Sequence, residues 1–265
     1  MMQKPFTTVL ISDVCYAIAG GKHLLLDIVQ PDPPPQSRMP VIVEIHPGGW
    51  MYGEKYGPRN QLFAEHGFFT VSINHRLSGE ATFPAQIEDV KMAVRWLRVQ
   101  ADTYHLDPQR IGVWGESSGG HLAALLGTAA DRQVPEGEPV HALSSAQVQA
   151  VATISGPTDL LLLGNAYVSS LLGGPPQDQA ELARLANPLT FLNRHHPVPP
   201  FLIIHGTQDS QVPFQQAVLF HEALKAVEAD VTFRSVEAGH NLLGSHQKET
   251  CQALLLDFFT KYLSG

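Results

Sequence analysis

The stretch that decides the fold is Ile111-Gly-Val-Trp-Gly-Glu-Ser-Ser-Gly-Gly-His-Leu-Ala-Ala-Leu-Leu126. Its pattern predicts an apolar strand, a glycine-rich turn and an apolar helix. Within the turn, Gly115-Glu-Ser-Ser-Gly119 fits the Gly-x-Ser-x-Gly pattern of a nucleophile elbow, where small residues let the strand and the helix approach closely. We therefore expect the hydroxyl of Ser117 to be presented openly at this turn.

The segments on either side of the elbow alternate between strand and helix patterns. Expected strands are residues 7–11, 24–29, 41–45, 68–73, 148–154, 201–205 and 231–236, and expected helices are residues 60–66, 84–100, 214–227 and 250–263. The first two strands are expected to pair antiparallel across Gly20-Gly21. The rest of the alternation predicts an α/β fold with a mostly parallel central sheet covered by helices on both faces.

Three segments interrupt this alternation. Residues 31–40 carry five prolines and are expected to form an exposed connection, because proline cannot pair inside a sheet. Residues 131–147 are polar, with proline and glycine among them. Residues 156–200 mix leucine clusters with Gly and Pro, and we predict a small lid-like insertion there. Residues 1–265 are thus expected to form one domain.

The composition limits the function classes. The chain has 265 residues, 44% of them hydrophobic, and a formal net charge of −8, which argues against nucleic acid and anionic membrane surfaces as partners. No signal peptide or membrane-spanning run is evident, so we expect a soluble cytoplasmic protein. The sequence does not decide whether its two cysteines, Cys15 and Cys251, form a disulfide. The sequence does not indicate an oligomeric state.

A serine nucleophile needs a base, and the base needs a carboxylate that orients it. Ligand sites in parallel sheets lie beyond the carboxyl ends of the strands. Asp209 follows the strand 201–205, and His240 follows the strand 231–236. The order Ser117, Asp209, His240 is the one found in α/β-hydrolases. We predict these three as catalytic residues. No cofactor is required, and no HxxxH or HxH pair indicates a metal site.

The loop after the strand 41–45 is the candidate oxyanion hole. His46-Pro-Gly-Gly-Trp50 is similar to the HGGG signature, and glycine lets the main chain approach a substrate. Pro47 has no N–H, so the predicted donors are the backbone N–H groups of Gly48, Gly49 and Ser118. The side chains of Trp50, Tyr52 and Phe214 are candidate walls of the substrate pocket.

Together these motifs resemble α/β-hydrolase carboxylesterases of the small-lid group, which includes hormone-sensitive-lipase-like enzymes and acetyl xylan and feruloyl esterases. The segments that carry the resemblance are residues 26–28, 46–50, 74–77, 83–98, 107–111, 115–122, 205–209 and 238–240. Three residues depart from the family pattern: Pro47 in the oxyanion motif, His75 where relatives usually have Tyr, and Ser118 where they usually have Ala.

The resemblance implies hydrolysis of short-chain or carbohydrate-linked esters, such as acetyl and feruloyl esters, through an acyl-enzyme. Its expected partner is a small-molecule or carbohydrate ester. An arylformamidase-type amide hydrolase is the alternative within the enzyme class, because arylformamidases share the HGG-Trp and Ser-x-Gly-Gly-His-Leu features. A non-catalytic binding protein is the alternative outside it, since fold does not imply function.

Overall fold

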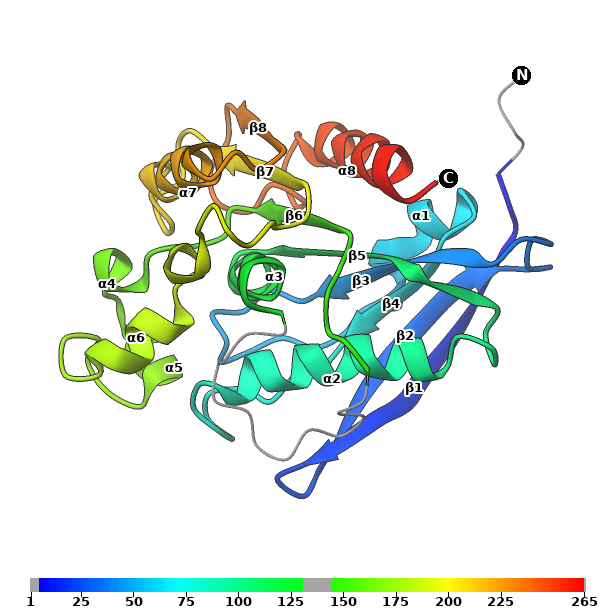
Figure 1. Ribbon diagram of the computed structural model, residues 1–265, viewed down its shortest axis with the longest axis horizontal. Coiled ribbons are helices and arrows are strands. Elements are labelled where there is room, and N and C mark those ends of the chain that lie inside the picture. The colour runs from blue at the N-terminus through cyan, green and yellow to red at the C-terminus, as the bar shows by residue number, and fades with distance from the viewer. Residues whose placement is uncertain (1–4, 131–143, 265) are drawn as a thin grey trace.

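An eight-stranded sheet organises the molecule (Figure 1). The computed structural model describes residues 5–130 and 144–264. In spatial order the strands are β1 (Thr8–Ala19), β2 (Lys22–Pro31), β4 (Phe69–Ile73), β3 (Met39–Ile45), β5 (Leu106–Glu116), β6 (Ala150–Ile154), β7 (Phe201–Gly206) and β8 (Val231–Val236). The pairs β1/β2 and β2/β4 are antiparallel, and all other neighbours are parallel. The predicted mostly parallel sheet is confirmed.

The antiparallel hairpin at the start of the chain is also as predicted. Gly20 and Gly21 form its turn with φ of 57° and 77°, a conformation that glycine adopts without strain. β1 nevertheless runs to Ala19, well beyond the predicted end at residue 11. Register shifts between Ile11 and Val14 and again after Cys15 interrupt the alternation of side chains, so a period-two pattern misses the second half of the strand.

Alternate residues of the central strands pack into two cores on opposite faces of the sheet. Val41 and Val43 contribute to the larger core, and Ile42 between them contributes to the smaller one. The larger core includes residues of α2 (Ala85–Val99), α3 (Ser118–Ala129) and α7 (Gln215–Ala226). The smaller core includes residues of α1 (Gln61–Glu65) and α8 (Lys248–Leu263). Figure 1 shows these helices on the two sides of the sheet, as the sequence predicts.

Two of the three interrupting segments can be followed in the structure. Residues 32–38 form a largely exposed connection between β2 and β3, as predicted, although Pro31 and Pro40 belong to the strand ends. Residues 131–143 of the polar segment lie outside the described residues. Between β6 and β7 the chain forms α4 (Leu160–Leu163), α5 (Ala166–Leu172), α6 (Ala180–Ala186) and the 3-10 helix η2 (Pro188–Phe191), which follow β6 to one end of the molecule (Figure 1).

Local capping explains why the segment 156–200 is helical although its sequence shows no clear periodicity. The side chain of Asp159 accepts a hydrogen bond from Leu162 N, and Asn165 does the same for Val168 N. Gly164 ends α4 in a left-handed conformation. Helices this short span one or two turns, so hydrophobic periodicity cannot detect them. The role of a lid stays a prediction.

The described cysteines do not pair. Cys15 is a free thiol on the exposed side of β1, and Cys251 is a free thiol buried in α8. Cys15 and Cys251 therefore do not form a disulfide with each other. Among the helices within residues 5–130 and 144–264, none is long and apolar enough to cross a membrane.

Candidate active site

Ser117 lies at a sharp turn between β5 and α3. Its φ of 55° and ψ of −121° place it in a region that non-glycine residues seldom adopt. Two backbone hydrogen bonds hold the turn: Ser117 N donates to Ile154 O at 2.8 Å, and His121 N donates to Ser117 O at 3.0 Å. The sequence therefore forms the strained strand-to-helix turn that the Gly-x-Ser-x-Gly pattern predicts.

The structure brings Ser117, His240 and Asp209 together although they lie far apart in the sequence. They follow β5, β8 and β7, whose carboxyl ends share one edge of the sheet. His240 Nδ1 lies 2.7 Å from Asp209 Oδ2, and His240 Nε2 lies 2.9 Å from Ser117 Oγ. An ionised carboxylate can only accept, so Nδ1–H donates to Asp209 and Nε2 is free to accept the serine proton.

The Asp209 carboxylate is surrounded by hydrogen-bond donors. Its Oδ1 accepts from Gln211 N and Val212 N at 2.9 Å each, and its Oδ2 faces His240 Nδ1 and, at 3.3 Å, His205 Nε2. Burial by itself would raise the pKa of Asp209, but the hydrogen bonds from His205, His240 and Val212 outweigh it and hold the pKa below its usual range. Asp209 is therefore ionised at neutral pH.

His205 is a buried residue of the site that sequence reasoning treats only as a strand end. Its Nε2–H donates to Val212 O at 2.9 Å and also points at Asp209 Oδ2. Since Val212 N donates to Asp209 Oδ1, His205 and Val212 close a ring of hydrogen bonds around the carboxylate. One feature of the sequence could have identified His205: it ends a buried strand and precedes Asp209 by four residues.

The candidate oxyanion residues lie beside the serine. Gly48 and Gly49 follow β3 with φ of 133° and 60°, and Ser118 is the first residue of α3, where backbone N–H groups have no partner within the helix. All three border the same cavity as Ser117 and His240. Their role as donors stays a prediction. The Oγ of Ser118 is buried and has no hydrogen-bond partner among the described residues.

A cavity of about 750 Å³ opens over these residues. Besides the oxyanion loop, its walls come mainly from the insertion between β6 and β7 and from the loop after β7: Pro157, Leu163, Asn165, Tyr167, Ser210, Gln211 and Val212. The insertion thus borders the site. Tyr52 borders the cavity, and 61% of its surface is exposed; its role as a wall of the substrate pocket stays a prediction.

The other two predicted pocket walls differ from each other. Trp50 borders the cavity but is only 2% exposed, and its Nε1–H donates to His121 Nδ1 at 3.2 Å, which ties the oxyanion loop to α3. Phe214 does not line the cavity, so this prediction is wrong. Its ring packs against Phe233 of β8 at a centroid distance of 5.7 Å and makes a T-shaped contact with His205 at 6.0 Å. Phe214 supports the strands beneath the site.

Two stacked imidazoles lie at the start of the candidate oxyanion loop. The rings of His46 and His75 have centroids 4.4 Å apart and are nearly parallel. Each Nδ1 bonds to a backbone carbonyl, of Pro47 at 2.8 Å and of Arg76 at 3.0 Å, so each Nδ1 carries the proton. Burial lowers the pKa of both residues, that of His75 to about 3. Both rings are therefore neutral at pH 7.

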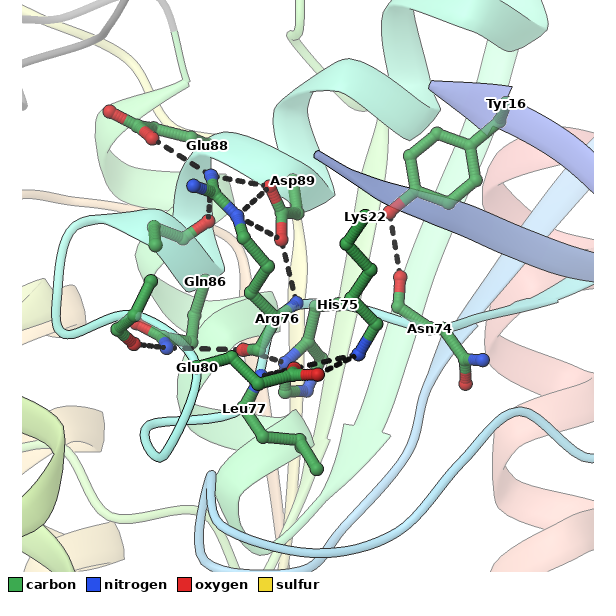
Figure 2. A network of polar contacts seen from close by, with 12 residues as sticks. Tyr16, Lys22, Asn74, His75, Arg76, Leu77, Glu80, Gln86, Glu88 and Asp89 are labelled. Atoms are coloured by element: carbon green, nitrogen blue, oxygen red, sulfur yellow. Dashed lines mark hydrogen bonds and ion pairs between the residues drawn. The ribbon is translucent and has the colours of Figure 1, made fainter. Parts of the chain in front are cut away.

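A polar network holds His75 in this position (Figure 2). The guanidinium of Arg76 binds the carboxylates of Asp89 at 2.7 Å and Glu88 at 3.0 Å. On the other side of His75, Asn74 O accepts a hydrogen bond from Tyr16 OH at 2.6 Å. The segment after β4 is thus fixed to α2 and to β1, and it presses His75 against the first residue of the oxyanion loop.

The His75→Tyr variant should lose less of its free energy of unfolding at acid pH than the wild-type protein does. Between pH 6.5 and about 3 the unfolded chain binds a proton at His75 that the folded chain does not, so stability falls as the pH drops below 6.5. At pH 5 this difference costs about 2 kcal/mol relative to pH 7.5, and His75→Tyr should remove it. Urea unfolding at both pH values measures the change.

The exposed His195 supplies the matched control for this variant. His195→Tyr removes a histidine without altering the buried pair and should keep the wild-type dependence on pH. If His75→Tyr and His195→Tyr show the same loss of stability between pH 7.5 and pH 5, the buried ring of His75 does not resist protonation.

Comparisons with known proteins identify a family and several similar esterases. A family model described as BD-FAE matches residues 26–224. The chain is 33% identical over 242 residues to the esterase LipQ of Mycobacterium tuberculosis, a match that covers 87% of this chain and 56% of LipQ. The chain thus spans about half the length of the curated relatives that it matches first.

Solved structures resemble the chain over nearly its whole length. A truncated carbohydrate esterase from gut microbiota is 28% identical with a TM-score of 0.84, and the match covers 100% of this chain and 99% of that one. Esterase Est2 of Thermogutta terrifontis in its propionate-bound form is 26% identical with a TM-score of 0.79, covering 94% of this chain and 93% of that one.

Proposed function

The chain belongs to the BD-FAE family of α/β-hydrolases, and we propose that it is a serine carboxylesterase acting on short-chain or carbohydrate-linked esters. The observation that carries the proposal is the pair of hydrogen bonds that links Ser117 to His240 and His240 to Asp209 at the floor of a cavity. The similarity to named esterases supports the same reaction class.

In the proposed mechanism, Ser117 Oγ attacks the acyl carbonyl carbon while its proton passes to His240 Nε2. The carbonyl oxygen becomes an oxyanion, which the backbone N–H groups of Gly48, Gly49 and Ser118 stabilise. His240 then gives its proton to the leaving alcohol, and the acyl group remains on Ser117. Water attacks this acyl-enzyme, gives a proton to His240, and releases the carboxylic acid as the serine is restored.

The ionised Asp209 supports this cycle at the steps in which His240 is positively charged. Its negative charge lies 2.7 Å from Nδ1, which stabilises the imidazolium and fixes the tautomer that leaves Nε2 as the base. Pro47, which departs from the family pattern, is compatible with the proposed oxyanion hole. It lacks an N–H, but its carbonyl accepts from His46 Nδ1 and so fixes the first turn of the oxyanion loop.

Short acyl groups should be hydrolysed best. Pro157, Leu163, Tyr167 and Val212 are among the residues that line the cavity, and we assign the acyl group to them. Structures of the related Est2 hold propionate and butyrate, acids of three and four carbons. In a series of p-nitrophenyl esters we expect kcat/KM to be highest for C2 to C4 acyl groups and about tenfold lower at C8. A maximum at C8 or beyond would contradict this expectation.

The carbohydrate-linked part of the proposal and the amide alternative are tested with natural-type substrates. Acetylated xylan and methyl ferulate distinguish acetyl from feruloyl preference. N-Formylkynurenine tests arylformamidase activity, which the HGG-Trp and Ser-x-Gly-Gly-His-Leu motifs also permit. We expect kcat/KM for an acetyl ester to exceed that for N-formylkynurenine, and the reverse order would assign the site to amide hydrolysis.

A further inference from the structure

His121 is a buried histidine that the proposed mechanism does not use. It belongs to α3, four residues after Ser117, and is 0% exposed. Both nitrogens of its ring have hydrogen-bond partners: Nδ1 lies 3.2 Å from Trp50 Nε1, and Nε2 lies 2.8 Å from Ala186 O. Trp50 ends the candidate oxyanion loop, residues 46–50, and Ala186 ends α6 of the insertion. One imidazole therefore joins three elements that surround the catalytic serine.

The two hydrogen bonds fix the tautomer of His121. A carbonyl oxygen can only accept, so Nε2 carries the proton that Ala186 O accepts, and Nδ1 accepts from the indole N–H of Trp50. This arrangement requires a neutral ring, because an imidazolium would present a second N–H to the indole. Burial lowers the pKa of His121 to about 4. At neutral pH the ring therefore offers Trp50 an acceptor.

Trp50 needs such an anchor because its backbone is strained. Its φ is 60°, a left-handed conformation that a bulky residue rarely adopts, and it follows Gly48 and Gly49, whose φ values are also positive. Glycine tolerates this region, but Trp50 must be held there by its surroundings. Its indole is buried and meets the ring of His121 at 90°, with the ring centroids 5.1 Å apart. The only side chain among these three residues is thus fixed to α3.

The backbone at Trp50 is continuous with the proposed oxyanion donors. A rotation that relieved its left-handed conformation would turn the peptide that joins it to Gly49 and displace the glycine N–H groups. Oxyanion donors act at about 2.7–3.1 Å from the developing charge, and a displacement of about 1 Å can cost about 100-fold in rate. The indole of Trp50 is therefore in a position to hold the donors in place.

The hydrogen bond to Ala186 determines how the ring of His121 is turned. Ala186 is buried at the end of α6, and the 3-10 helix η2 begins two residues later and contacts α3. The insertion thus packs directly on the helix that carries His121. Because Nε2–H is bound to Ala186 O, the opposite nitrogen of the ring faces Trp50. The insertion reaches the oxyanion loop through this ring.

We propose that His121 is a positioning residue of the oxyanion hole. The carbonyl of Ala186 orients its ring, and the ring holds Trp50 so that the preceding glycine N–H groups point at the reacting carbonyl oxygen. The inference rests on the proposed esterase function and adds a residue that does not line the catalytic cavity. It also gives the insertion a part in transition-state stabilisation.

Two amide variants separate the two hydrogen bonds of His121. His121→Asn places an oxygen near the position of Nδ1 and keeps an acceptor for Trp50. His121→Gln places an NH₂ group near the position of Nε2, which keeps a donor for Ala186 but leaves Trp50 without its acceptor. Each variant loses one buried hydrogen bond, so their stabilities should fall alike. For a short p-nitrophenyl ester we expect kcat to fall about tenfold or more in His121→Gln and less than about threefold in His121→Asn, with KM nearly unchanged.

A trifluoromethyl ketone reports on the oxyanion hole itself. Ser117 Oγ adds to its carbonyl carbon, the serine proton passes to His240, and the carbonyl oxygen becomes an anion in the oxyanion hole. The inhibition constant should therefore rise in His121→Gln in parallel with the loss of kcat. A fluorophosphonate counts the functional molecules. A purely structural defect would lower the labelled fraction and leave kcat per labelled molecule and the inhibition constant unchanged.

Trp50→Phe removes the same hydrogen bond from the other side. It should lower kcat per labelled molecule as His121→Gln does, and the double variant should lose no more than the worse single variant, because both delete one interaction. Trp114→Phe is the matched control. Trp114 is also 2% exposed, and its Nε1–H donates to Asn60 at 3.3 Å in the smaller core, so its kcat should stay at the wild-type level.

A loss of kcat and of ketone affinity in His121→Gln and Trp50→Phe, with His121→Asn and Trp114→Phe near the wild type, supports the proposal. Equal losses in the two His121 variants, or wild-type kcat in both, overturn it. So does wild-type kcat in Trp50→Phe, and the comparison of Trp50→Phe with Trp114→Phe decides the question if a His121 variant does not fold. A wild-type protein that neither hydrolyses the ester nor reacts with the fluorophosphonate contradicts the proposed function itself.

Discussion

Replacing Ser117 by alanine should reduce kcat for a short p-nitrophenyl ester by a factor of about 10⁴ or more. Without Oγ, His240 has no nucleophile to activate, and only the oxyanion donors and substrate binding can still favour the transition state. The side chain's hydrogen bond to His240 is lost. The backbone hydrogen bonds that hold the turn remain. The thermal midpoint and the circular dichroism spectrum should therefore stay close to those of the wild type.

The neighbouring serine offers the matched control. The Oγ of Ser118 has no hydrogen-bond partner within the described part of the chain, and Ser118→Ala keeps the backbone N–H that the mechanism uses. This variant should retain most of the activity, and a fluorophosphonate probe should label it but not Ser117→Ala. If Ser117→Ala hydrolyses the ester as fast as the wild type, or the wild type resists the probe, the catalytic assignment is wrong and a binding role regains support.

Much of the candidate site could be predicted because each of its parts directly follows a strand. The segments before Glu116, Gly206 and Val236 carry β-branched or apolar residues that make them recognisable as strands, and parallel pairing brings their carboxyl ends to one edge. Ser117, Asp209 and His240 each lie within four residues of such an end. Sequence order and the strand pattern together therefore bring them near one another without knowledge of any side-chain contact.

What sequence reasoning missed depends on packing between elements. Phe214 follows the acid loop and is aromatic, but its ring turns toward Phe233 because α7 packs against β7 and β8. His205 appears as a strand residue, and its bond to Asp209 becomes visible only when the loop to Val212 folds back. Arg59 lies in the 3-10 helix Gly57–Asn60, which has no sequence pattern of its own, yet it borders the catalytic cavity.

Replacing Gly119 by alanine should destabilise the fold by about 3 kcal/mol or more, because the new Cβ has no space. Built on this backbone, it would collide with the carbonyl oxygen of Ile45 and lie 2.8 Å from the carbonyl oxygen of His46. Neither oxygen can move away freely. Ile45 pairs with β4 on one side and with β5 on the other, and His46 begins the oxyanion loop. Urea unfolding measures the cost.

Gly79→Ala is the matched control for this change, since a Cβ at Gly79 meets nothing within 4 Å and the backbone there is not in the left-handed region. It should unfold at the wild-type urea concentration. In the fraction of Gly119→Ala that still folds, the elbow and β3 must separate, which moves Ser117 away from Gly48 and Gly49. The specific activity per folded molecule should therefore fall along with stability. A Gly119→Ala protein as stable and active as Gly79→Ala would mean that the elbow and the oxyanion loop are not held in contact.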